Sequence, residues 1–198
     1  MVLMGHSTGC QDIMEFLTGK GKDEREKVDG VVLQAGVSDR EAITSIGLDE
    51  ELEESIEKVR NLLKDGTPPT DILPSELTSP FYSSTPLTAS RFLSLVTKDG
   101  DDDYFSSDLS DSDLQKSFGA LPEDVGLLVL LGSDDEYMGE DTDRKALVDR
   151  WCGFAKIAGA KVDEGCGVVE GATHNLKGCD DEVVQDLVGR VKGYLERL

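Results

Sequence analysis

The sequence has few of the residues on which membrane, metal and disulfide proteins depend. Its longest apolar run, residues 125–131, is much shorter than the ~20 residues that a membrane-spanning helix needs. Histidine occurs twice, and the four cysteines are too widely spaced for paired zinc ligands or a dense disulfide framework. These cysteines are Cys10, Cys152, Cys166 and Cys179. We therefore expect no metal, no cofactor, and reduced thiols in a cytoplasmic protein.

Basic residues are also scarce. Lysine and arginine number 20 against 41 aspartates and glutamates, which gives a net charge of −21 at pH 7. A chain with this charge repels nucleic acids and anionic membrane surfaces, so neither is expected as a partner. The apolar residues 1–4 are followed by His6 too early for a secretory signal peptide. The charge identifies no substrate, and the sequence leaves the oligomeric state open.

Short apolar runs and helical patterns alternate along the 198 residues. Strands are expected at residues 1–4, 28–35, 125–131 and 165–170, and helices at 10–17, 39–63, 88–95, 112–118, 142–158 and 180–198. The apolar stripe of the helix at 39–63 begins with Ile46. Five prolines between residues 68 and 86 predict a loop with short helices. The alternation predicts an α/β fold with a mostly parallel sheet.

The pentapeptide Gly5-x-Ser7-x-Gly9 lies between the first apolar run and the first predicted helix. This is the context of a nucleophile elbow, in which a serine occupies a strained turn from strand to helix. The flanking glycines are expected to let neighbouring backbone pass without a Cβ clash. The helix N-terminus, including the backbone N–H of Thr8, would then face developing negative charge and contribute to an oxyanion hole.

A serine hydroxyl needs a base to accept its proton at neutral pH. His6 is adjacent to Ser7 in the chain, so its side chain is expected to point elsewhere, and we interpret it as packing or lining a pocket. His174 follows the last predicted strand, where a loop can bring it over the carboxyl edge of the sheet. The sequence therefore predicts His174 as the base, although a histidine without a catalytic role is the plainer alternative.

The base in turn needs an acid that fixes its tautomer and stabilises the imidazolium. Asp135 fits this role because it lies just past the strand at 125–131, although composition does not exclude its neighbours Asp134 and Glu136. The order Ser7, Asp135, His174 is the chain order of α/β-hydrolases, and it differs from the order in chymotrypsin and subtilisin.

Several longer stretches carry a more specific resemblance. They are residues 4–12 (MGHSTGCQD), 33–35 (LQA), 37–41 (VSDRE), 91–95 (RFLSL), 99–109 (DGDDDYFSSDL), 135–137 (DEY) and 171–175 (GATHN). These stretches span nearly the whole chain and resemble a fungal family of α/β-hydrolases of unknown function, the DUF1749 group. Because this group includes siderophore esterases of the fusarinine type, the resemblance implies siderophore esters as one substrate class.

The sequence departs from the family pattern in two places. Met138 and Gly139 stand where the family usually has Val-Pro, which could alter the loop that carries the acid. Family members also have several strands before the elbow, and these include the loop that donates the second oxyanion amide. We therefore expect an α/β-hydrolase fold that lacks its N-terminal strands. A chain truncated in this way would be weakly active or inactive.

Two functional hypotheses follow. The first is a serine hydrolase that cleaves a carboxylic ester of a small molecule, built as one partial domain over 1–198 with a cap-like helical insertion at about 37–120. The alternative is a truncated or degenerate homologue that only binds a ligand or has no activity. The acidic residues 99–108 are expected to form a solvated loop, with a calcium loop or a cap element at the substrate entrance as alternatives.

Overall fold

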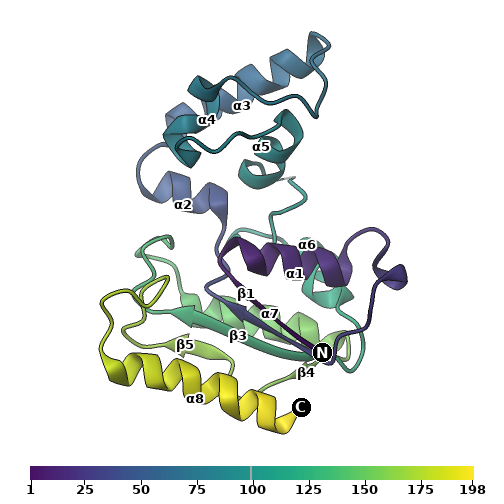
Figure 1. Ribbon diagram of the computed structural model, residues 1–198, viewed down its shortest axis with the longest axis vertical. Helices are drawn as coiled ribbons and strands as arrows, with labels where there is room; N and C mark the ends of the chain where they lie inside the picture. The colour runs from purple at the N-terminus through teal and green to yellow at the C-terminus, as the bar shows by residue number, and fades with distance from the viewer. Residues whose placement is uncertain (99) are drawn as a thin grey trace. The chain divides into compact units, whose positions relative to one another are not determined.

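The computed structural model describes residues 1–98 and 100–198, and the chain divides into two compact units (Figure 1). The first unit comprises Met1–Val37 and Ser107–Leu198, and the second comprises Ser38–Ser106. The first unit contains the sheet, and the second contains helices α2 to α5.

A parallel sheet forms the centre of the first unit. Its strands are β1 (Val2–His6), β2 (Gly30–Gln34), β3 (Gly126–Gly132), β4 (Lys161–Val162) and β5 (Gly167–Val169). They are ordered β1-β2-β3-β4, with β5 also paired to β3, and every pairing is parallel. The predicted α/β fold with a mostly parallel sheet is therefore confirmed. The two-residue strand β4 is too short to leave a hydrophobic pattern, and the sequence did not predict it.

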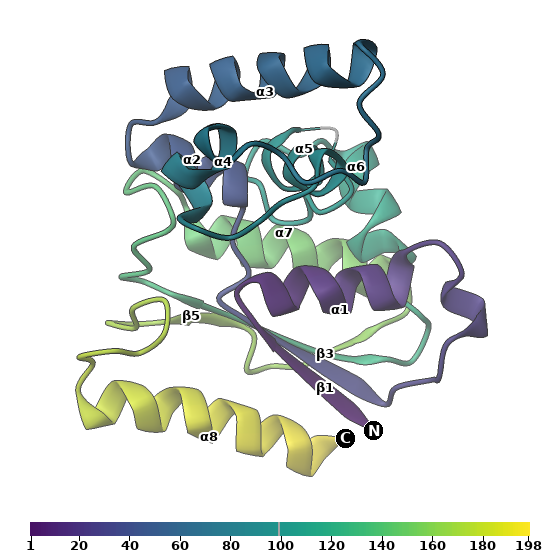
Figure 2. The ribbon, with the colours of Figure 1, turned by 45° about the horizontal axis from the view of Figure 1, so that its top comes forward.

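Helices cover both faces of this sheet (Figure 2). The first unit contains α1 (Thr8–Thr18), α6 (Asp111–Lys116), α7 (Arg144–Ile157), α8 (Asp181–Arg197) and the short 3-10 turns Lys22–Glu24 and Phe118–Ala120. Helices α1 and α7 lie on one face and α8 lies on the other. Val32, Leu128 and Leu130 point toward α8 and pack with its Leu187 and Tyr194. Burial on both faces explains why β2 and β3 read as continuous apolar runs.

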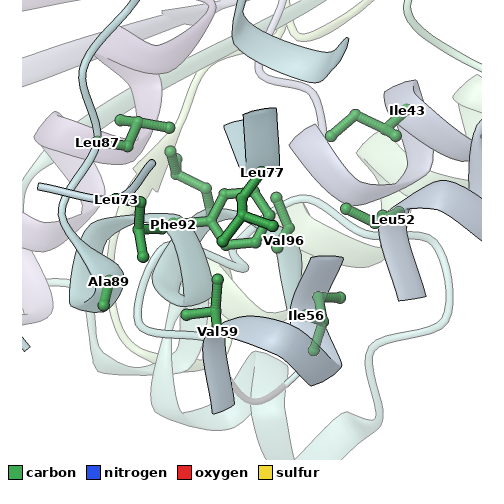
Figure 3. Close-up of a cluster of buried hydrophobic side chains, with 11 residues drawn as sticks. Ile43, Leu52, Ile56, Val59, Leu73, Leu77, Leu87, Ala89, Phe92 and Val96 are labelled. Atoms are coloured by element: carbon green, nitrogen blue, oxygen red, sulfur yellow. The ribbon is translucent and has the colours of Figure 1, made fainter. Parts of the chain in front are cut away.

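The second unit is a small helical body with its own core (Figure 3). Its helices are α2 (Asp39–Ser45), α3 (Asp49–Lys64), α4 (Ser75–Tyr82) and α5 (Ala89–Val96). Phe92 and Val59 are fully buried in the cluster of apolar side chains that these helices share. Ile72 and Thr88 form an antiparallel bridge, which closes the proline-rich segment around α4. As predicted, that segment contains a short helix between loops.

The helix predicted at residues 39–63 is interrupted. Helix α2 ends at Ser45, and α3 begins at Asp49. Gly47 between them has a φ of 77°, a left-handed conformation that ends a helix and that glycine adopts without strain. The break removes Ile46 from the apolar stripe, and its side chain is 65% exposed. The assignment of Ile46 to the buried stripe was therefore wrong.

The expectation that residues 99–108 form a solvated loop was also wrong for most of the segment. Residue 99 lies outside the described residues. Asp102 forms an ion pair with Arg91, and Asp103 forms one with Arg40 at 2.9 Å between Oδ2 and Nε. The side chain of Asp103 is only 3% exposed, and Phe105 is buried. The carboxylates therefore act as partners of arginines from α2 and α5 within the second unit.

Residues 107–120, which the expected insertion included, belong to the first unit. Phe118 stacks on Trp151 of α7 with ring centroids 5.5 Å apart. The second compact unit is accordingly shorter than the predicted insertion at about 37–120, and its role as a cap stays a prediction.

No helix within residues 1–98 and 100–198 combines the length and apolar content required to cross a membrane.

The environment of Asp39 at the start of α2 predicts that the free energy of unfolding depends on pH. Burial raises its pKa to about 6, although the hydroxyl of Tyr82 and the charge of Arg91 partly offset this effect. Its pKa in the unfolded chain is near 4, so the folded protein binds more protons between pH 4 and 6. The contribution of Asp39 to the free energy of unfolding therefore falls as the pH rises through this window.

We expect Asp39→Asn to remove this fall and to raise the free energy of unfolding at pH 7 by about 1–3 kcal/mol. Urea denaturation followed by circular dichroism between pH 4 and 7 measures the difference from wild type. Asp49→Asn is the matched control, because Asp49 is an exposed aspartate at the corresponding first position of α3. A difference between Asp39→Asn and wild type that stays constant across this range would contradict the prediction.

Candidate active site

Ser7 occupies the turn between β1 and α1 in a strained backbone conformation. Its φ is 54° and its ψ is −127°, a region that residues with a side chain rarely adopt. The backbone N–H of Ser7 donates to the carbonyl of Gln34 at 3.1 Å, and its own carbonyl accepts from Cys10 N–H at 2.8 Å. Strain of this kind persists where surrounding bonds enforce it, and it is concentrated at functional sites.

The two glycines that flank Ser7 have different structural roles. A Cβ on Gly5 would lie 2.4 Å from the carbonyl oxygen of Gly9, so β1 and α1 approach too closely for any side chain there. A Cβ on Gly9 would meet nothing within 4 Å. The sequence interpretation assigned the same steric reason to both glycines, and the structure supports it for Gly5 alone.

His174 lies in the loop that follows β5 and contacts both other predicted members of the constellation. Its Nε2 is 2.9 Å from Ser7 Oγ, and its Nδ1 is 2.8 Å from Asp135 Oδ2. His174 and Asp135 are 6% and 2% exposed, so the pair is shielded from water. With the Nδ1 proton donated to the carboxylate, Nε2 is left to accept the serine proton.

The loops after β3 and β5 hold this pair by backbone contacts. Asp134 N–H donates to the carbonyl of Ala172 at 3.0 Å. A Cβ on Gly132 would lie 2.1 Å from that carbonyl oxygen, which explains the glycine at the end of β3. These contacts fix the distance between the loop that carries Asp135 and the loop that carries His174.

The structure separates the three acidic residues that the sequence left open. Asp135 accepts from the His174 imidazole and, through Oδ1, from Tyr137 N–H at 3.0 Å. Asp134 is exposed and accepts from the Ser133 hydroxyl at 2.7 Å. Glu136 accepts from the backbone N–H of His174 at 3.0 Å rather than from its ring. Of the three, Asp135 is thus the carboxylate that contacts the imidazole ring of His174.

Thr8 is the first residue of α1, directly after Ser7. The first N–H groups of a helix have no acceptor within the helix, and the helix dipole favours negative charge at this end. The backbone N–H of Thr8 therefore lies where an anion next to Ser7 would be stabilised. Its contribution to an oxyanion hole stays a prediction.

Two aromatic rings flank the His174 imidazole. The ring of His6 lies 4.9 Å away between centroids, and the ring of Tyr137 lies 4.6 Å away in an edge-on arrangement. His6 is exposed, and its Nδ1 is 2.5 Å from Oε1 of Gln34. Sequence reasoning assigned no role to Gln34 or Tyr137. A polar residue that closes the apolar run of β2 is the signal that could have identified Gln34.

Cys10 is not a competing nucleophile. Its thiol is buried and donates to the carbonyls of Gln34 at 3.3 Å and Gly5 at 3.4 Å. Burial raises the pKa of this thiol to about 12, so it stays protonated at neutral pH. Within the part of the chain that the structure describes, no three His, Cys, Asp or Glu side chains are grouped as a metal site requires.

The family described as "Protein of unknown function (DUF1749)" matches residues 1–196. The chain belongs to the DUF1749 family. The resemblance given by the sequence motifs is therefore confirmed.

Two esterases and one solved siderophore hydrolase are among the proteins that this chain is similar to. Fusarinine C esterase sidJ of Aspergillus fumigatus is 36% identical over 236 residues, which cover 100% of this chain and 67% of the relative. Esterase AN6793 of Emericella nidulans is 31% identical, over 98% of this chain and 64% of the relative. The solved siderophore hydrolase EstB from Aspergillus fumigatus superposes with a TM-score of 0.76 at 34% identity, over 99% of this chain and 66% of that structure.

These comparisons establish the fold but cover only part of each relative. The similarity to EstB confirms the predicted α/β-hydrolase fold. The chain spans about two thirds of the length of each of these three relatives.

The contrast between the two elbow glycines gives a stability prediction. Gly5→Ala places a methyl group against the backbone of Gly9, so we expect it to lower the free energy of unfolding by about 1–3 kcal/mol. Gly9→Ala has space and lies within α1, so we expect no loss and a gain of up to about 1 kcal/mol. Urea denaturation of both variants is the measurement, and equal destabilisation by the two substitutions would contradict this account of the elbow.

Proposed function

We propose that this chain carries the catalytic centre of a serine esterase that hydrolyses carboxylic esters of small molecules. The observation that carries the proposal is the continuous arrangement of Ser7 Oγ, the His174 imidazole and the Asp135 carboxylate, with contacts of 2.9 and 2.8 Å. The names of the esterase and hydrolase relatives support the same reaction class.

The first half of the proposed reaction acylates the serine. Ser7 Oγ attacks the ester carbonyl while His174 Nε2 accepts its proton, and Asp135 stabilises the imidazolium that forms. The negative charge on the tetrahedral intermediate lies near the start of α1, where the N–H of Thr8 can donate to it. When the intermediate collapses, the carbon–oxygen bond to the alcohol breaks and His174 returns the proton to that alcohol.

The second half releases the acid. Water replaces the alcohol, His174 Nε2 removes its proton, and the resulting hydroxide attacks the acyl carbonyl. Collapse of this second intermediate breaks the bond to Ser7 Oγ and returns the proton to the serine. No residue changes its oxidation state, and the reaction consumes one water for each ester.

For the substrate class, we propose siderophore esters as the first compounds to test, because two relatives are named for fusarinine C and siderophore hydrolysis. This choice rests on those names and not on a pocket in this chain. Simple chromogenic esters test the reaction class without depending on the choice of siderophore esters.

The test is labelling with a fluorophosphonate, followed by peptide mass spectrometry. We expect one covalent adduct on Ser7, and no labelling at that position in Ser7→Ala. His174→Ala removes the base and Asp135→Asn removes the partner that fixes its tautomer, so each should slow labelling by about 10³–10⁴-fold. Ser112→Ala, which changes an exposed serine on α6, is the matched control and should label like wild type.

Hydrolysis of chromogenic esters by wild type and the same variants completes the test. An adduct on another residue, or equal labelling of wild type and His174→Ala, would contradict the proposed mechanism. A folded wild-type protein that neither labels nor hydrolyses these esters would instead favour the alternative, a protein that binds its ligand without catalysis.

A further inference from the structure

Gln34 contacts Ser7, His6 and His174, although it lies on a different strand from His6 and outside the turn and the loop that carry the other two. It is the last residue of β2, its register partner in β1 is His6, and it is 8% exposed. Its backbone carbonyl accepts from the N–H of Ser7 at 3.1 Å. Its side-chain amide contacts His6 through Oε1 at 2.5 Å and the backbone carbonyl of His174 through Nε2 at 3.2 Å.

The chemistry of these contacts fixes the orientation of the Gln34 amide. The carbonyl of His174 can only accept a hydrogen bond, so the NH₂ group of Gln34 must face it. The amide oxygen then faces Nδ1 of His6, and this pairing requires a proton on that nitrogen. If the amide were flipped, its oxygen would face the carbonyl oxygen of His174, and its NH₂ group would face Nδ1 of His6.

We propose that Gln34 is a positioning residue that holds the His174 loop over Ser7 and keeps His6 in the Nδ1–H tautomer. The inference rests on the proposed function, because the proposed role of Gln34 is to align His174 Nε2 with Ser7 Oγ for proton transfer. Glu136 accepts from the N–H of His174 while Gln34 donates to its carbonyl, so both polar groups of the His174 backbone are held. The loop is thereby fixed from two directions.

The same amide controls the surroundings of the base. The ring centroid of His6 lies 4.9 Å from that of His174, so the two imidazoles are neighbours. With Nδ1 of His6 donating to Gln34, a neutral His6 has no second proton to offer on Nε2. Gln34 therefore acts on His174 both through the backbone and through the neighbouring imidazole.

The test separates the two ends of the Gln34 side chain. Gln34→Met keeps an unbranched chain of similar length but removes both hydrogen bonds, whereas His6→Phe removes only the bond at Oε1. We expect Gln34→Met to lower the rate constant of fluorophosphonate inactivation about 10–100-fold with little change in the inhibitor's binding constant. We expect His6→Phe to lower it less than about 5-fold. Gln115→Met is the matched control, since the amide of Gln115 also donates to a backbone carbonyl but is exposed on α6.

Nitrogen-15 NMR of the two histidines gives a readout that does not depend on activity. At alkaline pH we expect wild-type His6 to carry its proton on Nδ1. We expect Gln34→Met to abolish that preference and to shift both ring nitrogens of His174. A variant that was merely less stable would label a smaller fraction of molecules, while the remainder reacted at the wild-type rate.

The outcomes separate this inference from the proposed function. If wild type does not label at Ser7, the esterase proposal fails, and the NMR spectra still decide the role of Gln34. If Gln34→Met leaves both the rate constant and the His174 nitrogen shifts at their wild-type values, the inference is overturned. If Gln34→Met and His6→Phe slow inactivation equally, the backbone contact to His174 contributes nothing, and that part of the proposal is wrong.

Discussion

The in-register parallel pairing of β1, β2 and β3 is the constraint on which the site depends. Register places His6 beside Gln34 and Gln34 beside Leu130, so the carboxyl ends of these strands meet at one edge of the sheet. The loops that leave this edge then bring together residues as distant in sequence as Ser7 and His174. A slip of one residue would send the alternating side chains to the opposite face. The buried apolar runs of β2 and β3 therefore determine the geometry of the polar site.

The strained backbone of Ser7 has a cost that the surrounding contacts offset. A residue in such a region costs on the order of 1–3 kcal/mol, and it persists only where its neighbours over-determine it. Ser7 is held by its bonds to Gln34 and Cys10, and the absent side chain of Gly5 lets α1 pack directly on β1. The single thiol proton of Cys10 is shared between the carbonyls of Gly5 on β1 and Gln34 on β2. The buried thiol is thus part of the support of the elbow and not of its chemistry.

Sequence reasoning predicted the features that depend on local pattern, and it missed those that depend on distant partners. Ser7, Asp135 and His174 were predictable because each follows an apolar run, and parallel strands bring such positions to one edge. Gln34 was missed because its role follows from strand register, which a single sequence does not specify. The burial of Asp103 was missed because its partner, Arg40, lies in another helix and charge runs are usually solvated. The helix break at Gly47 was hidden because apolar spacing continues on both sides of the glycine.

The turn that carries Ser7 follows a strand that has one neighbour in the described sheet. Strand β1 pairs with β2 alone, and Met4 on it is 57% exposed. The histidine that lies within hydrogen-bond distance of Ser7 Oγ follows β5 and is therefore carried by another part of the sheet. Gln34 is the residue of β2 that bonds both to the elbow and to the histidine loop. The backbone carbonyl of Gln34 bonds to the turn and its side-chain amide bonds to the loop, so one residue at the end of β2 links the two segments.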